Sequence, residues 1–348
     1  MRPIKQTHKN IDAHYIGGLM ENKNQISDCF DSTIKSVPHE NLHFCSNDGI
    51  KSVYKIPSAT GAMTCYDIFS GVQICFNDLQ TTQSLPSQDS KSNIMEINYC
   101  VRGRHECEFS DGTCSFIGEG DLCVNMFRHT PQNARFPLGY YEGIGLFLDM
   151  ERAPYALAHA MNGVEIDLKA LCQKLHLGTG CFFLPSNPSI SHIFSDLYDV
   201  DPQIKISYFR IKTLELLLFL GSNRVLESKR AQRYYPRFTV DAVKAIKEKM
   251  TQEYQTHFTL EELAAEHAIS LSSLKNCFRD IYGQTPYAYL KQYRIQRAAK
   301  LLCEGGHSIG WIANHVGYGG TGKFAAAFKS VMGCSPSEYR KTHSPIGM

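Results

Sequence analysis

The sequence has no segment of the kind that crosses a membrane or directs export. No run of about eighteen or more apolar residues occurs in the chain of 348 residues, which argues against a transmembrane helix. The first ten residues, MRPIKQTHKN, lack the apolar core of a signal peptide. We therefore expect a cytoplasmic protein with no membrane partner, whose length allows two domains.

CxxC pairs are also absent, although the chain contains thirteen cysteines. Zinc sites and dithiol active sites commonly use such pairs. An odd number of cysteines without an export signal predicts reduced thiols that serve as small core residues. A redox or metal sensor built from some of them is the alternative.

Charge is unevenly distributed along the chain. From residue 230 to the end there are sixteen Lys and Arg against nine Asp and Glu, a net charge of +7, whereas the preceding residues carry −5. A basic tail behind an acidic front part indicates that only the tail meets a polyanion such as nucleic acid.

The front part of the chain has the pattern of short strands from Met63 to about Leu148. Turns rich in Gly and Asp separate four clear segments, which are Ile94–Val101, His105–Phe109, Thr113–Ile117 and Leu122–Phe127. Strands at this spacing predict a barrel or a sandwich.

Helical spacing replaces this pattern near Pro188. Ile190–Leu197 and Ile204–Leu220 are predicted helices. The second is more apolar than one buried face requires, which predicts either a core helix or a dimer seam. Asn223–Arg237 has few apolar residues and is predicted to be a linker.

An internal repeat occupies the tail. The segment Phe278–Pro286 recurs fifty residues later as Phe328–Pro336. Upstream, Ala268 matches Gly317 with an offset of forty-nine, so the second turn is one residue longer. A repeat of this length indicates two copies of one small structural unit.

Each copy has the order of a helix-turn-helix. In the first, Thr259 and Glu262 predict a capping box, Ala268–Ser270 form the turn, and Ser270 caps the second helix. In the second copy Ser308 is the predicted cap, and a glycine permits the tight turn.

A helix between the copies is predicted to join them. Thr285 caps it, Pro286 occupies its first turn, and Gly305-Gly306 stops it. Ser335 and Glu338 predict a further capping box at a short final helix. Two recognition helices on one connector can read adjacent turns of a DNA duplex, because a helix fits the major groove.

The tail closely resembles the DNA-binding domain of the AraC/XylS family of bacterial regulators over about residues 237–341. The segments that carry the resemblance are Thr259–Ala264, Tyr289–Leu290 with Arg294–Ala298, Ile312–Ala313 with Val316–Tyr318, Phe324, and Phe328–Lys329 with Gly333–Arg340. The resemblance implies two recognition helices, Ser272–Ile281 and Thr321–Val331, whose outward residues contact bases and phosphates.

The outward polar residues of these two helices are the predicted DNA contacts. They are Ser272, Ser273, Lys275, Asn276, Arg279, Thr321, Lys323 and Lys329. The second helix departs from the first, because Ala325 and Ala326 stand where the first has Lys275 and Asn276. We therefore expect weaker base readout by the second helix.

The stretch Met95–Asp121 resembles the cupin-like sensing domain that many AraC-type regulators carry in front. This resemblance implies a small effector bound inside a barrel, and dimerisation through the helices that follow. His129, in a predicted loop, is the candidate effector contact, and His105 is expected to be a solvated strand residue. Cupin-type metal enzymes need a His-x-His pair, which is absent, so we predict no catalytic residue, no metal and no cofactor.

These observations predict an α+β protein with three parts. Residues 1–222 form an effector-sensing and oligomerisation domain, with a cupin-like β-barrel over about 63–150 and helices over about 189–222. Residues 223–236 are the linker, and residues 237–342 form an all-α DNA-binding domain with two helix-turn-helix units.

The predicted function is that of a transcription regulator and not of an enzyme. Its partners are double-stranded DNA, a small-molecule effector, a second copy of the chain and, for an activator, RNA polymerase. Two alternatives remain: a DNA-binding regulator with no effector, and a metal-dependent cupin enzyme fused to a DNA-binding tail.

Overall fold

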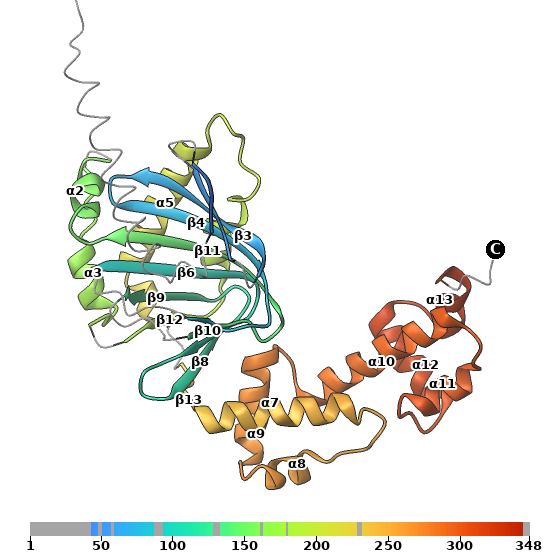
Figure 1. Cartoon of the computed structure of the whole chain (residues 1–348). Coiled ribbons are helices and arrows are strands. Elements are labelled where there is room, and N and C mark those ends of the chain that lie inside the picture. Colours follow the sequence, from blue (N-terminus) through green and yellow to red (C-terminus); the bar gives the residue numbers. More distant parts are fainter. Residues whose placement is uncertain are drawn as a thin grey trace, which may run out of the picture. The chain divides into compact units, whose positions relative to one another are not determined.

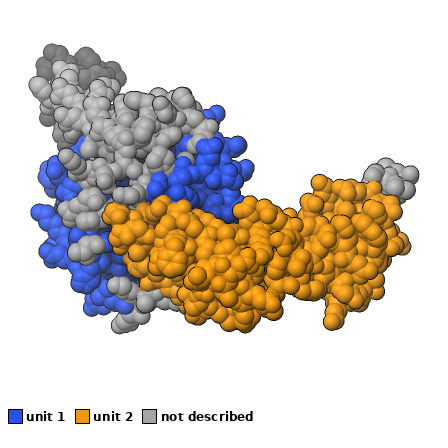
Figure 2. All heavy atoms as spheres, turned by 60° about the horizontal axis from the view of Figure 1, so that its bottom comes forward, with its two compact units in different colours: residues 1–103, 119–231 blue, residues 104–118, 232–348 orange. Residues whose placement is uncertain are grey.

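The computed structural model describes residues 43–47, 51–56, 59–86, 93–127, 133–160, 163–178, 180–227 and 232–343. The chain divides into two compact units, which Figure 2 colours separately. Residues 1–103 and 119–231 form the first unit, and residues 104–118 and 232–348 form the second. The first is built on a sheet and the second on helices, so the predicted α+β class is confirmed.

An eight-stranded antiparallel sheet is the framework of the first unit (Figure 1). Its strand order is β1-β2-β3-β4-β11-β6-β9-β12. The strands are β1 (His43–Asn47), β2 (Lys51–Lys55), β3 (Thr60–Phe69), β4 (Val72–Gln80), β6 (Ile94–Gly103), β9 (Leu122–Met126), β11 (Tyr140–Asp149) and β12 (Phe182–Leu184). A short pair, β5 (Leu85–Pro86) with β10 (Asn133–Arg135), completes the strands of this unit. The predicted strands at residues 94–101 and 122–127 are confirmed.

The two faces of this sheet differ in character because side chains alternate along each strand. One face is apolar: Ile74, Leu146, Ile97 and Val124 are aligned across four neighbouring strands and are buried. They belong to one core cluster with residues from the helices of the unit. Those helices are α2 (Ala153–Ala158), α3 (Leu168–Lys174), α4 (Pro188–Ser195), α5 (Lys205–Gly221) and α6 (Arg224–Glu227).

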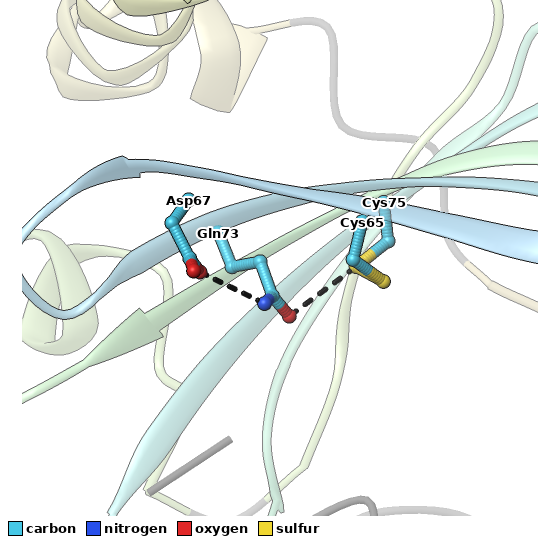
Figure 3. The surroundings of a disulfide bond; sticks show 4 residues. All are labelled: Cys65, Asp67, Gln73 and Cys75. Atoms are coloured by element: carbon cyan, nitrogen blue, oxygen red, sulfur yellow. Dashed lines mark hydrogen bonds between the residues drawn. A yellow bond between two sulfur atoms is a disulfide. The ribbon is translucent and has the colours of Figure 1, made fainter. Parts of the chain in front are cut away.

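A disulfide bond joins two neighbouring strands on the opposite face of the sheet. Cys65 of β3 and Cys75 of β4 are paired in register, with their Cα atoms 4.0 Å apart (Figure 3). The expectation that all cysteines are reduced is therefore wrong for this pair, because strand pairing brings together two thiols that are ten residues apart in the sequence. Nine further cysteines in the described residues are free, and most of them are buried.

Seven helices span residues 237–343 of the second unit. They are α7 (Arg237–Gln252), α8 (Leu260–Glu266), α9 (Leu271–Tyr282), α10 (Pro286–Glu304), α11 (Ile309–His315), α12 (Thr321–Met332) and α13 (Pro336–His343). The same unit contains a β-hairpin that lies more than a hundred residues earlier in the sequence, β7 (His105–Glu108) with β8 (Thr113–Ile117). Strand β13 (Tyr235–Pro236), within the predicted linker, pairs with β8.

None of the helices in the described part of the chain combines the length and the apolar character needed to span a bilayer.

Candidate nucleic-acid interface

The first helix-turn-helix consists of α8 and α9. Both hydrogen bonds of the predicted capping box are present: the Glu262 amide donates to Thr259 Oγ1 at 3.2 Å, and the Thr259 amide donates to Glu262 Oε2 at 3.1 Å. Between the helices, Ala268 has a positive φ of 54°. Leu274 and Phe278, on the inner side of α9, are fully buried.

The outer side of α9 carries the residues predicted to contact DNA. Lys275 and Arg279 are exposed and Asn276 is half-buried. The two serines are already engaged at the start of the helix: Ser270 Oγ lies 3.0 Å from Ser272 Oγ and 2.9 Å from Ser273 Oγ. Of the predicted DNA contacts on α9, Lys275, Asn276 and Arg279 are therefore the three that take no part in the described cap of the helix.

The second helix-turn-helix consists of α11 and α12. Ser308 Oγ accepts from the Trp311 amide at 3.1 Å, which confirms the predicted cap. Thr321, Lys323 and Lys329 are exposed on α12. In contrast to α9, α12 starts at Gly320 with no side-chain cap, so its first amide groups are left for other partners.

The connector α10 holds the two helix-turn-helix motifs together through one arginine that sequence analysis did not single out for this role. The buried Arg294 donates through Nε to the Tyr254 carbonyl at 2.6 Å and through Nη2 to the Thr256 carbonyl at 2.9 Å, both just before α8. Its guanidinium also lies 6.0 Å from the ring centroid of Tyr318, which is in the turn of the second helix-turn-helix. Burial lowers the pKa of Arg294.

That turn also shows why a glycine occupies position 317. Gly317 has a φ of 84°, and a Cβ there would lie 2.9 Å from Nη2 of Arg294. The repeat-matched Ala268 also has a left-handed conformation, with a φ of 54°.

Comparison with known proteins identifies this arrangement. Residues 263–342 match the family described as "Helix-turn-helix domain". A "Putative AraC-like transcription regulator" from Streptomyces antibioticus is 41% identical over 88 residues, which cover 25% of this chain and 29% of the relative. The "RCS-specific HTH-type transcriptional activator RclR" of Escherichia coli K12 is 38% identical over 84 residues, which cover 24% of this chain and 30% of the relative. The C-terminal part of the chain is an AraC-type helix-turn-helix domain.

A solved structure is also similar to this chain. The C-terminal domain of AraT, a response regulator from Geobacillus stearothermophilus, is 30% identical, with a TM-score of 0.29 over 30% of this chain and 86% of that one. The sequence matches span less than a third of the two curated relatives, so the likeness to those relatives concerns the AraC-type domain alone.

The AraC-type domain carries an aromatic stack that sequence analysis missed. Trp311 is 42% exposed, and its ring lies between His307, with centroids 3.8 Å apart, and His315, with centroids 4.5 Å apart. The signal in the sequence was the spacing of four residues between Trp311 and His315, which places both side chains on one side of α11, whereas His307 precedes the helix.

The first compact unit, which contains the eight-stranded sheet, has a second candidate site on the sheet face that carries the disulfide. Gln73 donates to Asp67 Oδ1 at 2.9 Å (Figure 3), and Asn125 donates to Glu96 Oε2 at 3.3 Å. The hydroxyl of Tyr141 donates to Asn98 Oδ1 at 2.7 Å. We call Asp67, Gln73, Glu96, Asn98, Asn125 and Tyr141 the polar face.

The polar face contains polar side chains that are buried, among them Gln73, Asn98 and Asn125. Burial raises the pKa of Glu96 to about 6, although the Asn125 hydrogen bond opposes this shift. Gly145 pairs in register with both Cys75 and Asn98, and the ring of Phe147 lies over it, since a Cβ at Gly145 would be 3.1 Å from that ring. Carboxylates and amides gathered on one face of a sheet are suited to hydrogen-bond a small polar molecule.

Of the two histidine predictions, one falls outside the described residues and the other is wrong. His129, the candidate effector contact, lies outside the described residues. The expectation of a solvated His105 is wrong: both ring nitrogens are buried, and burial lowers the pKa of the imidazole to about 4. Within the described ranges, no group of three or more His, Cys, Asp or Glu side chains is arranged to hold a metal ion.

Proposed function

We propose that this protein is a cytoplasmic, sequence-specific DNA-binding transcription regulator of the AraC/XylS type. The observation that carries the proposal is the pair of helix-turn-helix units on one connector helix. On α9 of the AraC-type domain, Lys275, Asn276 and Arg279 lie on the outer side of a capped helix whose inner side is buried. The net charge of +7 from residue 230 onward supports attraction to the phosphate backbone.

Selection from a random duplex library with the full-length protein tests this proposal. We expect enrichment of one operator sequence, and an affinity that falls steeply as salt rises, because bound lysines and arginines release counterions from DNA. Fluorescence anisotropy across a salt series measures the slope. Failure to enrich any sequence, or an affinity independent of salt, contradicts the proposal.

We further propose that a small polar effector binds at the polar face of the front unit. Glu96, Asn125 and Asn98 lie on the same face of the sheet and offer both acceptors and donors. A molecule with several hydroxyl or amine groups suits this chemistry, because carboxylate and amide side chains can both donate to and accept from such groups. A regulator without an effector remains the rival proposal.

The protein is also proposed to be a homodimer that pairs through α5. Three large apolar residues, seven positions apart, are exposed along this helix and at its N-cap: Ile204, the cap residue, at 54%, Ile211 at 57% and Leu218 at 47%. The opposite side of the helix is already in the core, with Phe209, Leu216 and Leu217 buried. A row of exposed apolar side chains at heptad spacing favours a paired helix.

An acidic residue in the middle of this row is expected to break the dimer. Sedimentation of the Ile211→Asp variant at tens of micromolar should give the monomer mass, while the wild type gives twice that mass, because the pair would bury two unpaired carboxylates. Ala170→Asp, which adds the same charge at an exposed position of α3, should remain dimeric. A monomeric wild type, or a dimeric Ile211→Asp, contradicts the proposal.

A further inference from the structure

The β7–β8 hairpin is joined to the AraC-type domain by main-chain and side-chain hydrogen bonds. Tyr235 of β13 pairs with Cys114 of β8, and the Arg237 amide donates to the Gly112 carbonyl at 3.0 Å. Ser115 Oγ donates to the Arg233 carbonyl at 3.0 Å. These contacts place the hairpin in one compact unit with the recognition helices, although it lies between β6 and β9 in the sequence.

A buried ion pair strengthens this attachment. The carboxylate of Glu106 is fully buried, and Lys244 of α7 lies 2.6 Å from its Oε2. Arg237 lies 3.7 Å from Oε1 of Glu106 and 2.9 Å from Oε2 of Glu108. Removing either cation would leave the buried Glu106 carboxylate less compensated, so its loss is expected to destabilise the packing of the hairpin against α7.

Arg104, at the start of the hairpin, reaches the end of the first recognition helix. Its Nη1 donates to the Asp280 carbonyl at 3.0 Å, in the last turn of α9. A Cβ at Gly283, the residue that ends this helix, would lie 3.2 Å from Nε of Arg104. A cation at a helix C-terminus satisfies free carbonyls and interacts favourably with the helix dipole.

The side chain of Asp280 is held from a second direction. The hydroxyl of Tyr235 donates to Oδ2 at 2.6 Å, and Nη1 of Arg233 lies 3.4 Å from the same oxygen. The main-chain and side-chain oxygens of one residue near the end of α9 are thus both bound by residues outside the helix-turn-helix.

The internal repeat supplies a comparison within the same molecule. Ser330 of α12 stands where α9 has Asp280, and Gly333 stands where α9 is followed by Gly283. A Cβ at Gly333 would meet nothing within 4 Å, and the contact to Ser330 comes from Lys291 of the connector at 2.9 Å. Within the described residues, the hydrogen bond to the last turn of α9 comes from the front of the sequence, whereas the one to Ser330 of α12 comes from the connector.

We propose that Arg104 is a positioning residue for the first recognition helix, α9, and that the hairpin thereby sets the sequence selectivity of the first helix-turn-helix alone. This inference rests on the proposed DNA-binding function. Arg104 follows β6, the strand that carries Glu96 and Asn98 of the polar face, so a change at that face has a short covalent route to α9.

A double-mutant cycle in the full-length protein tests the inference. The readout is discrimination, the ratio of the dissociation constants for random and operator DNA. Arg104→Ala should lower discrimination about tenfold, the effect of one lost base contact, with little change in affinity for random DNA. Asn276→Ala should add little to this loss when combined with Arg104→Ala. Arg104→Lys should restore most of the discrimination, because an ammonium group can also donate to the Asp280 carbonyl.

Lys291→Ala is the matched control, since it removes the corresponding contact to α12. Its effect and that of Asn276→Ala should add in full. If Arg104→Ala fails to fold, Arg104→Met, which keeps the aliphatic length and removes the donors, takes its place. Wild-type discrimination in the Arg104 variant, or full additivity with Asn276→Ala, overturns the inference alone. A wild type that does not discriminate overturns the proposed function as well.

Discussion

Alanine at Asn276 or Lys275 is expected to reduce discrimination between operator and random DNA by about 10- to 100-fold, because one well-placed base contact contributes about 1–3 kcal/mol of selectivity. Both side chains lie on the outer side of α9, where Lys275 is exposed and Asn276 half-buried. Binding of each variant to operator and to random duplexes across a salt series measures the effect.

Lys323→Ala and Lys329→Ala on α12 are the comparison for this experiment. Both lysines are exposed, and the neighbouring Ala325 and Ala326 offer no hydrogen bonds to bases. We expect these two variants to weaken binding to all sequences alike and to reduce the salt slope by about one each, as lost phosphate contacts do. The assignment of roles to the two helices is wrong if Lys323→Ala relaxes sequence choice while Asn276→Ala does not.

Glu96→Gln is expected to stabilise the ligand-free protein by up to about 2 kcal/mol above pH 6, given about 1.4 kcal/mol per unit of pKa shift. Burial raises the pKa of Glu96 from 4.5 to about 6. The unfolded chain loses this proton near pH 4.5 and the folded chain only near pH 6, so ionisation lowers stability between these two values. Glutamine carries no charge and escapes that loss.

Thermal or urea unfolding of both proteins between pH 4 and pH 8 tests this expectation. The same variant should lose the rise in melting temperature that a bound effector causes, because the polar face loses an acceptor. Glu151→Gln, at an exposed position after β11, is the control and should show neither effect. Equal stability of wild type and Glu96→Gln at pH 7.5 contradicts the burial of this carboxylate.

The helices of the AraC-type domain could be predicted well from sequence because their ends are encoded locally. Thr259, Ser270 and Ser308 each cap a helix through a residue three positions later, and the structure contains all three caps. The predicted recognition helices differ from α9 and α12 by one residue at most at each end. The repeat doubled this signal, since each copy supported the interpretation of the other.

Features that depend on distant parts of the chain could not be predicted in this way. The Cys65–Cys75 bond follows from the register of β3 with β4, and register is not a local property. The hairpin at residues 105–117 was predicted as two strands, but nothing in its sequence indicated that it packs with helices that begin at Arg237. Arg294 looked like an ordinary helix residue until its two carbonyl partners were known.

The participation of the hairpin in the second unit has a consequence for biosynthesis. Glu106 leaves the ribosome 138 residues before its partner Lys244, so its carboxylate must stay hydrated, or be otherwise compensated, during that interval. Contacts so distant in sequence slow folding, since a long loop must close before they stabilise anything. The hairpin can therefore reach its final packing only late in synthesis, after Lys244 of α7 has been made. A gene fusion that moves residues 232–348 to another protein transfers the recognition helices without the strands that hold the first of them.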